Sequence, residues 1–186
     1  MKMNDNQNSI LLVLDIDETL IYASTERLEK TSDFCLNEYY VYERNHLKEF
    51  LLECAEHFEL AIWSSASTDY VQAIVEHIRP GSIKFAFVWD NSRCTTRIDP
   101  ETGQRVCFKD LKKLKRKGYS LERVLFVEND PQAVQRHYGN AVYVKSFNGE
   151  PDDELLFLSK YLKTLADVSG VRKIEKRTWR NQARNL

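Results

Sequence analysis

The sequence predicts an α/β fold in which a doubly wound, mostly parallel sheet lies between two layers of helices, a Rossmann-like three-layer sandwich. Short apolar segments alternate along the chain with segments of helical length and spacing, which is typical of this fold class. The first apolar segment, Ile10–Ile16, is continuous rather than alternating, as expected for a parallel strand covered on both faces. A length of 186 residues with 42% hydrophobic residues suits one domain with a sizeable core.

The first half of the chain is expected to form two strands, a flap and two helices. Phe34–Tyr42 is aromatic and rich in residues that favour strands, which indicates a small β flap after the first strand. Apolar residues then recur at helical spacing, and Arg79-Pro80-Gly81 ends the second helix. The elements expected after the flap are a helix that carries Leu47, Phe50, Leu51, Cys54, Ala55 and Phe58, a strand at Glu59–Trp63 and a helix at Thr68–Ile78.

The second half of the chain continues the alternation and contains a small β insertion. The insertion is expected at Asn91–Val106, with a turn at Asp99–Gly103. Asp110 and Gly118 are residue types that favour the two ends of a helix, so a helix is expected between them. The remaining expected elements are strands at Phe85–Trp89, Arg123–Val127 and Ala141–Val144, and helices at Leu111–Lys117, Pro131–Tyr138 and Asp153–Ala166.

The chain is expected to consist of a flexible N-terminus (1–9), one α/β domain (10–166) and a basic C-terminal tail (167–186). From Val171 to Leu186 there are six basic residues and one glutamate. Such a segment either docks an acidic partner or RNA, or folds back on the acidic body, and Trp179 indicates packing or contact. With 27 Lys and Arg against 28 Asp and Glu, the whole chain is not basic, and we do not expect specific nucleic-acid binding.

Several classes of protein are excluded by absent patterns. The longest apolar run, Ile10–Leu14, is far too short to span a membrane, and the polar start does not resemble a secretory signal. The four cysteines form no C-x-x-C pair, which favours reduced thiols and a cytoplasmic location, or a nuclear one in a eukaryote. No arginine lies six residues after a cysteine, so a cysteine-based phosphatase is excluded, and no Gly-rich dinucleotide or P-loop motif is present.

An acidic pair follows the first predicted strand. Asp15 and Asp17 are two residues apart in an extended segment, so their side chains share one face at the mouth of the sheet. Two close carboxylates repel each other unless a cation or a shared proton lies between them. Mg²⁺ prefers carboxylates together with phosphate oxygens, so the pair indicates a magnesium and phosphate site, with Thr19 close behind it.

Further polar residues follow the other predicted strands, where ligands gather in open α/β sheets. Ser64 follows the second strand and is placed to donate its hydroxyl to a phosphate oxygen. Lys109 precedes the Asp110 helix and supplies a point charge that neutralises phosphate. Glu128 and Asn129 follow the fourth strand and offer oxygen ligands, whereas Asp130 before a proline is the residue expected to cap the next helix.

From about Ile10 to Leu165, the chain resembles the haloacid dehalogenase (HAD) superfamily, in the branch of RNA polymerase II C-terminal-domain small phosphatases and NLI-interacting-factor-like phosphatases. The resemblance includes a β flap and insertion but no large cap domain, because only 46 residues separate Asp17 from Ser64. The chain departs from the branch at its last motif, where Glu-Asn-Asp-Pro replaces Asp-Asn-Ser-Pro. The matching motifs are Asp15-Ile16-Asp17-Glu18-Thr19-Leu20, Tyr42–His46, Trp63-Ser64-Ser65-Ala66, Phe108-Lys109-Asp110-Leu111 and Val124–Pro131.

The resemblance implies a Mg²⁺-dependent phosphatase with an aspartate nucleophile. Asp15 would attack phosphorus and Asp17 would act as general acid and then general base. Mg²⁺ would bind Asp15, the backbone carbonyl of Asp17 and Asn129, while Ser64 and Lys109 would hold phosphate oxygens. Thr19 would support the acidic loop, and Glu128 would either hold Mg²⁺ through water or support Lys109.

The open site that the resemblance implies suits a phosphoserine or phosphothreonine segment of a protein, and it also admits small phosphate esters. An alternative function is a binding or scaffold protein that retains the fold but has weak catalysis. The replacement of an Asp by Glu128 favours this alternative, whereas Asp15, Asp17, Ser64, Lys109 and Asn129 disfavour it.

Overall fold

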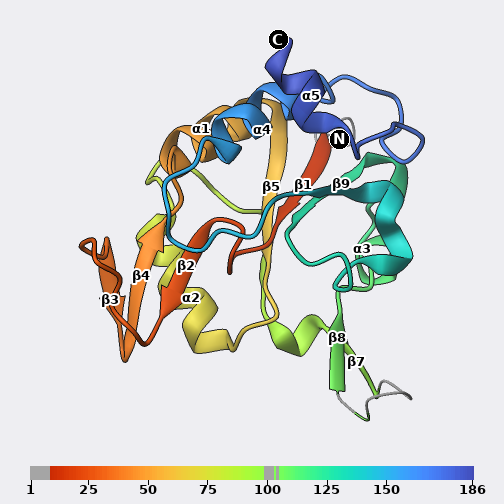
Figure 1. The fold of residues 1–186 in the computed structure, drawn as a ribbon. Coiled ribbons are helices and arrows are strands. Elements are labelled where there is room, and N and C mark those ends of the chain that lie inside the picture. The colour runs from red at the N-terminus through yellow and green to blue at the C-terminus, as the bar shows by residue number, and fades with distance from the viewer. Residues whose placement is uncertain (1–8, 99–102, 104) are drawn as a thin grey trace.

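The structure is a computed structural model that describes residues 9–98, 103 and 105–186 (Figure 1). Residues 1–8, which make up nearly all of the expected flexible N-terminus, and most of the expected turn at 99–103 lie outside the described residues. Within the described ranges, no helix is both long enough and apolar enough to cross a membrane.

The core of the molecule is a parallel sheet of five strands in the order β10-β9-β1-β5-β6, which confirms the predicted fold class. In the register of the sheet, Leu14 lies beside Ile62 on one side and Val127 on the other, so the three central strands end almost level. Side chains that directly follow these strands therefore meet at one edge of the sheet. The strands are β1 (Ile10–Leu14), β5 (Phe58–Trp63), β6 (Val88–Trp89), β9 (Val124–Glu128) and β10 (Ala141–Tyr143).

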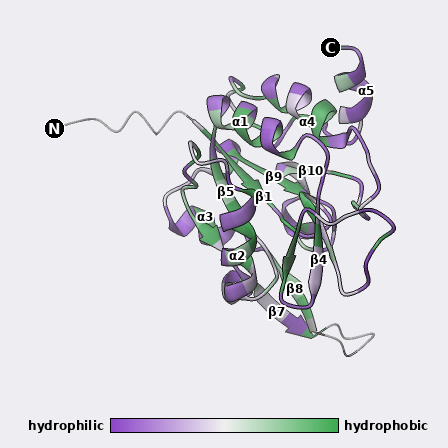
Figure 2. Cartoon of the chain, turned by 90° about the vertical axis from the view of Figure 1, so that its left-hand side faces the viewer, coloured by the Kyte–Doolittle hydropathy of each residue, from purple (hydrophilic) through white to green (hydrophobic). Residues whose placement is uncertain are grey.

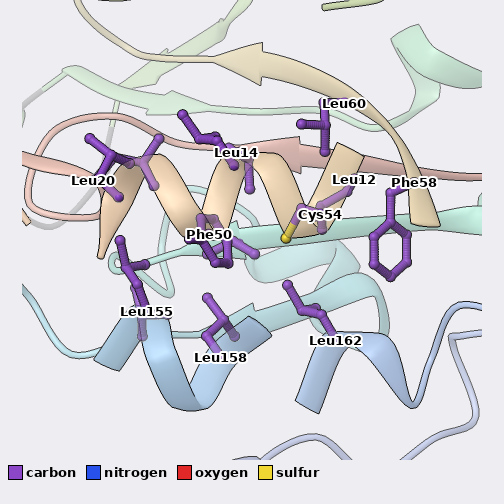
Figure 3. Packing of buried hydrophobic residues seen from close by; sticks show 14 of the residues in the cluster. Leu12, Leu14, Leu20, Phe50, Cys54, Phe58, Leu60, Leu155, Leu158 and Leu162 are labelled. Atoms are coloured by element: carbon purple, nitrogen blue, oxygen red, sulfur yellow. The ribbon is translucent and has the colours of Figure 1, made fainter. Parts of the chain in front are cut away.

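Helices cover both faces of the sheet. Alternate residues of β1 point to opposite faces, and all of them are buried, so both faces of this strand are covered. Ile10, Leu12 and Leu14 pack into the larger cluster together with residues of α1 and α4 (Figure 3). Leu11 and Val13 pack into a smaller cluster under α3. Hydrophobic residues accordingly follow the central strands, and hydrophilic residues face outward from the helices (Figure 2). The helices are α1 (Leu47–His57), α2 (Thr68–Ile78), α3 (Lys112–Arg116), α4 (Glu154–Lys163) and α5 (Trp179–Arg184).

Two small antiparallel units flank the carboxyl ends of the central strands (Figure 1). The flap is a three-stranded sheet in the order β2-β4-β3 and lies on the side of α2. The hairpin β7-β8 lies on the other side and forms the expected β insertion. The flap also includes β2, which lies outside Phe34–Tyr42, the segment where the sequence predicts the flap. These strands are β2 (Ile21–Ser24), β3 (Phe34–Leu36), β4 (Tyr39–Glu43), β7 (Thr95–Ile98) and β8 (Arg105–Phe108).

The helix expected at Pro131–Tyr138 is wrong. The chain forms turns there, followed by the 3-10 helix η4 (Gln135–Asn140), in which His137 has a non-helical φ of −134°. The backbone N–H of Lys109 donates to the carbonyl of Ala133 at 2.8 Å. The N–H of His137 instead bonds to Val134, three residues back, at 2.7 Å, so an α-helical turn does not form.

Three predicted strands are longer than the strands observed, and the last of them, Ala141–Val144, ends one residue early at Tyr143. The first strand ends at Leu14 instead of Ile16, because the carbonyl of Ile16 accepts hydrogen bonds in a tight turn with the N–H groups of Thr19, Leu20 and Ile21. The strand predicted at Phe85–Trp89 is reduced to β6, which comprises its last two residues. Two further 3-10 helices, η2 (Asn91–Arg93) and η3 (Leu121–Arg123), stand next to strands.

The basic segment 167–186 is folded back on the body. Val171, Trp179 and Ala183 are buried in the larger cluster, and the indole N–H of Trp179 donates to the carbonyl of Tyr143 at 2.8 Å. The guanidinium of Arg180 pairs with Glu154 in α4. Of the alternatives for this segment, the structure shows packing against the domain, and part of its positive charge is neutralised there.

Candidate active site

A tight loop after β1 presents the acidic pair at the edge of the sheet. The backbone N–H of Asp15 bonds to the carbonyl of Val127 at 3.1 Å, so this residue still follows the sheet. Glu18 adopts the left-handed region at φ 57°, and its carbonyl accepts the N–H of Phe147 at 2.7 Å. This strained residue turns the chain sharply and leaves the side chains of Asp15 and Asp17 facing the space above the sheet.

Asp15, Lys109 and Glu128 form a buried ion cluster. Their side chains come from three separate segments and are 5%, 2% and 1% exposed as residues. The ammonium of Lys109 donates to Oδ1 of Asp15 and, at 2.7 Å, to Oε2 of Glu128. An ammonium has three N–H donors, and within the described residues these two bonds use two of them. One donor therefore remains for a further acceptor.

The charges in this cluster depend on one another. Burial opposes the ammonium form of Lys109, but Asp15 and Glu128 outweigh it and raise the pKa of the lysine. Burial, followed by the negative charge of Asp15, raises the pKa of the Glu128 carboxyl, and Lys109 acts in the opposite direction. Lys109 is therefore a permanent cation beside Asp15, and Glu128 orients it.

Asp17 lies half-buried near this cluster, and two hydroxyl groups hold its carboxylate. The phenol of Tyr70 donates to its Oδ1 at 2.6 Å, and the hydroxyl of Ser64 donates to its Oδ2 at 3.4 Å. Burial raises the pKa of Asp17, the bond from Tyr70 lowers it, and the charge of Asp15 raises it, with a net upward shift. A carboxyl with a raised pKa is suited to carry a proton and then take one up.

Ser64 is fully buried at the end of β5. Its backbone N–H bonds to the carbonyl of Trp89 at 2.9 Å, and its hydroxyl oxygen accepts the N–H of Ala66 at 3.0 Å. The backbone thus fixes the hydroxyl oxygen, while the hydroxyl proton points to Asp17. This places Ser64 within reach of the same space as the acidic pair.

Asn129 joins the acidic loop to the end of β9. Its side-chain oxygen lies 3.1 Å from the hydroxyl of Thr19, which also lies 3.1 Å from Oδ2 of Asp15. Its amide nitrogen donates to Glu18 at 3.3 Å and to Ser146 at 3.2 Å. A hydroxyl has one proton, so it satisfies only one of its two oxygen neighbours at a time, and the other keeps a lone pair free for a cation.

The donor chemistry of the site fits Mg²⁺. The three carboxylates of Asp15, Asp17 and Glu128 face the single ammonium of Lys109, so negative charge is in excess when all are ionised. The available ligands are oxygen atoms, which Mg²⁺ prefers. Within residues 9–98, 103 and 105–186, no group of three Asp, Glu, His or Cys side chains is arranged around a common point. A metal here would therefore also need amide, backbone or substrate oxygens.

All seven side chains predicted from the sequence lie at this edge of the sheet, and two supporting residues were missed. Tyr70 lies in the first turn of α2, and an aromatic hydroxyl just after Ser64 was the available signal. Arg44 is 1% exposed, donates to the carbonyl of Thr19 at 2.9 Å and pairs with Asp152 at 2.7 Å. It clamps the acidic loop to the segment before α4. The residues brought together are Asp15, Asp17, Thr19, Ser64, Lys109, Glu128 and Asn129.

The chain is similar in sequence to known proteins. Residues 10–172 match the family model described as NLI interacting factor-like phosphatase. CTD small phosphatase-like protein 2 of Dictyostelium discoideum is 32% identical over 171 residues, 88% of this chain and 28% of that protein. The human carboxy-terminal domain RNA polymerase II polypeptide A small phosphatase 1 is 29% identical over 174 residues, 89% of this chain and 63% of that protein.

A solved structure shares the fold. The fission yeast RNA polymerase II CTD phosphatase Fcp1, bound to beryllium fluoride, superposes with a TM-score of 0.58 over 96% of this chain and 62% of that chain. The sequence identity is 14%, so this likeness concerns the fold alone. The two curated relatives and the fission yeast protein are all longer than the region they share with this chain.

Proposed function

Since this chain belongs to the NLI interacting factor-like phosphatase family, we propose that it hydrolyses phosphoserine or phosphothreonine in proteins through an aspartyl-phosphate on Asp15. The observation that carries the proposal is the contact of Asp15 with the buried cation of Lys109, beside a second carboxyl, Asp17, whose pKa is raised. The contact with Lys109 places Asp15 as the nucleophile, and Asp17 is suited to carry protons.

In the first step, a carboxylate oxygen of Asp15 forms a bond to phosphorus, and the bond from phosphorus to the substrate oxygen breaks. Asp17 gives its proton to that leaving oxygen, which departs as the serine or threonine hydroxyl. The remaining N–H of Lys109 and the hydroxyl of Ser64 hold oxygens of the phosphoryl group. Asp15 is then an acyl phosphate and Asp17 is a carboxylate.

In the second step, a water molecule attacks the phosphorus of the aspartyl-phosphate. Asp17 takes a proton from this water, and the bond between phosphorus and the Asp15 oxygen breaks. Inorganic phosphate leaves, Asp15 is a carboxylate again and Asp17 again carries a proton. Tyr70 keeps the carboxyl of Asp17 on the side of the site where both proton transfers occur.

We assign Mg²⁺ to Asp15, the backbone carbonyl of Asp17 and the side-chain oxygen of Asn129. When bound, the ion neutralises charge on the transferring phosphoryl group and aligns it with the nucleophile. The proximity of Asn129 and Asp15 through Thr19 supports this assignment. Glu128 is assigned to Lys109 rather than to the metal, because both of its oxygens are engaged, by Lys109 at 2.7 Å and by the N–H of Asp130 at 3.2 Å.

A phosphoprotein substrate is proposed for two reasons. The names of the relatives describe phosphatases of the C-terminal domain of RNA polymerase II. In addition, the flap, α1 and β5 make up the segment between Asp17 and Ser64, which leaves no residues in that segment for a large cap domain. An exposed peptide therefore has access to the site. The free thiols of all four cysteines support the proposed cytoplasmic or nuclear location.

The test is phosphate release from p-nitrophenyl phosphate and from a phosphoserine peptide, with and without Mg²⁺. Turnover should require Mg²⁺, and Asp15→Asn should abolish it because an amide does not form the acyl phosphate. Asp130→Asn is the matched control, because exposed Asp130 holds only the N–H of Gln132, at 2.9 Å. Turnover by Asp15→Asn within tenfold of the wild type, about 1.4 kcal/mol of barrier, contradicts the mechanism. No turnover by the wild type on either substrate favours the scaffold alternative.

A further inference from the structure

An open groove of about 790 Å³ leads away from Asp17 between the flap and α2. One wall is the turn between β3 and β4, which includes Glu38 and Tyr39, and the other is the first part of α2, which includes Asp69 and Tyr70. Asp17 belongs both to the catalytic site and to the groove, so the groove continues the site directly. A peptide whose phosphoryl group reaches Asp15 therefore has its flanking residues near this groove.

The charges that line the groove have one sign. Asp17, Glu38 and Asp69 line it, and none of its lining residues is Lys, Arg or His. Glu38 and Asp69 project from opposite walls, and within the part of the chain that the structure describes neither side chain forms a hydrogen bond or an ion pair. Two carboxylates without partners on facing walls attract a cationic group and repel an anionic one.

Two aromatic rings also line the groove. The rings of Tyr39 and Tyr70 lie edge to face with centroids 6.0 Å apart, one from each wall. The hydroxyl of Tyr70 is anchored on Asp17, which holds its ring in place. Aromatic faces bind ammonium and guanidinium groups, and the apolar stems of lysine and arginine pack on such rings while their charged ends reach carboxylates.

The opposite flank of the catalytic site has the opposite character. Beside Lys109, a surface lined by β7, β8 and η4 includes Arg97 and Arg136, together with Asp110, which pairs with His137. An acidic neighbour of the phosphorylated residue finds its partners there and not in the groove. The difference in charge between the two flanks distinguishes the two directions of a bound peptide.

We propose that the groove between the flap and α2 binds a lysine or arginine side chain that flanks the phosphorylated residue of the substrate. This inference rests on the proposed phosphatase function and adds a substrate class to it. The preference comes from Glu38 and Asp69, which take no part in the chemistry. It is therefore separable from turnover.

The experiment compares three phosphoserine peptides that differ only in having arginine, glutamine or glutamate at the positions flanking the phosphoserine. For the wild type, kcat/KM should be on the order of tenfold higher for the arginine peptide than for the glutamine peptide, mainly through KM. The double variant Glu38→Gln with Asp69→Asn should lose most of this preference but keep its activity on p-nitrophenyl phosphate. Glu76→Gln is the matched control, because Glu76 lies on α2 but outside the groove.

Charge reversal gives a second readout. Glu38→Lys with Asp69→Lys should make the glutamate peptide the better substrate, and higher ionic strength should weaken both preferences. The proposal is overturned if the wild type does not distinguish the peptides, if it prefers the glutamate or glutamine peptide, or if the arginine preference survives Glu38→Gln with Asp69→Asn.

Direct binding separates this inference from the proposed function. Fluorescence anisotropy of the same labelled peptides on Asp15→Asn protein needs no turnover. Tighter binding of the arginine peptide, together with no hydrolysis by the wild type, supports the groove and contradicts the phosphatase. Equal binding of the three peptides, together with rapid hydrolysis of p-nitrophenyl phosphate, contradicts the groove and leaves the phosphatase standing.

Discussion

Lys109→Met tests whether the ion cluster at the end of the sheet is held by charge. Lys109 is the one cation among the described groups that contacts both Asp15 and Glu128, and all three residues are buried. Methionine keeps most of the apolar stem, and the ammonium that it removes lies 5.6 Å from the centroid of the Phe126 ring. The substitution therefore removes the charge and the hydrogen bonds while it changes the packing little.

The expected loss of stability follows from the burial of the partners. Removing one partner of a buried ion pair costs about 3–5 kcal/mol, because the charge that remains is uncompensated. For a chain of this size, about 2–4 °C of melting temperature accompanies each kcal/mol, so the expected decrease is about 6–20 °C. Thermal unfolding followed by circular dichroism at pH 7.5 in EDTA measures it without interference from metal.

The pH dependence tests the cause of that loss. Lys109 lowers the pKa of Glu128, which burial already raises, so Lys109→Met raises the folded-state pKa further above the unfolded value of about 4.3. The folded variant then binds a proton that the unfolded chain does not bind at the same pH. In the wild type the pKa of Glu128 is already raised to about 7, so the loss of stability relative to the wild type is largest above the variant's folded pKa and should shrink as the pH falls to about 7.

Glu128→Gln is the matched control, because glutamine keeps the shape of the side chain and removes its charge. Added to Lys109→Met, it should restore part of the stability at pH 7.5, because only the carboxylate of Asp15 then remains uncompensated. A loss below about 1 kcal/mol for Lys109→Met, or a loss that does not shrink between about pH 9 and pH 7, refutes the reasoning that uncompensated buried charge is its cause.

Three further predictions address the other parts of the site and the C-terminal segment. In single turnover, Asp17→Asn should slow release of the alcohol from a phosphoserine peptide more than release of nitrophenol from p-nitrophenyl phosphate, because nitrophenolate leaves without a proton. The difference should lie within the roughly 10²–10⁴-fold range of general acid catalysis, and equal slowing contradicts the role of Asp17 as acid. Asn129→Ala should raise the Mg²⁺ concentration needed for half-maximal activity. Asp130→Ala should lower only stability, by about 1 kcal/mol, because it removes one hydrogen bond to the N–H of Gln132; the reverse result exchanges their roles. Trp179→Ala should lower the free energy of unfolding, measured by chemical denaturation, by about 3–5 kcal/mol. Leu186 is exposed at the same terminus, so Leu186→Ala should be nearly neutral, and equal effects contradict the packing of this segment.

The parallel sheet was predictable because the pattern of apolar residues depends on burial. A strand covered on both faces needs apolar side chains at every position, and Ile10–Leu14 is fully buried as this pattern requires. The predicted ends were less accurate where local hydrogen bonds decide them. The turn after Leu14 depends on the carbonyl of Ile16, and the lost helix at Pro131–Tyr138 depends on a bond from Lys109, far away in the sequence.

The meeting of the site residues was also predictable, because parallel strands bring their carboxyl ends to one edge. Asp15, Ser64 and Asn129 each follow a central strand, so their proximity follows from topology alone. The sequence by itself thus determined the fold class, the edge at which the polar residues gather and the residue types that would meet there.

Only the tertiary structure decided which atoms pair with which. Whether Glu128 faces a metal or Lys109 depends on the direction of a buried side chain, and the structure places its Oε2 2.7 Å from the lysine. Tyr70 and Arg44 act through bonds to residues 53 and 108 positions away, Asp17 and Asp152, which no local pattern records. Apolar burial is non-directional and leaves its mark in the periodicity of the chain, whereas hydrogen bonds and ion pairs depend on the positions of single atoms from distant segments, which exist only after the chain has folded.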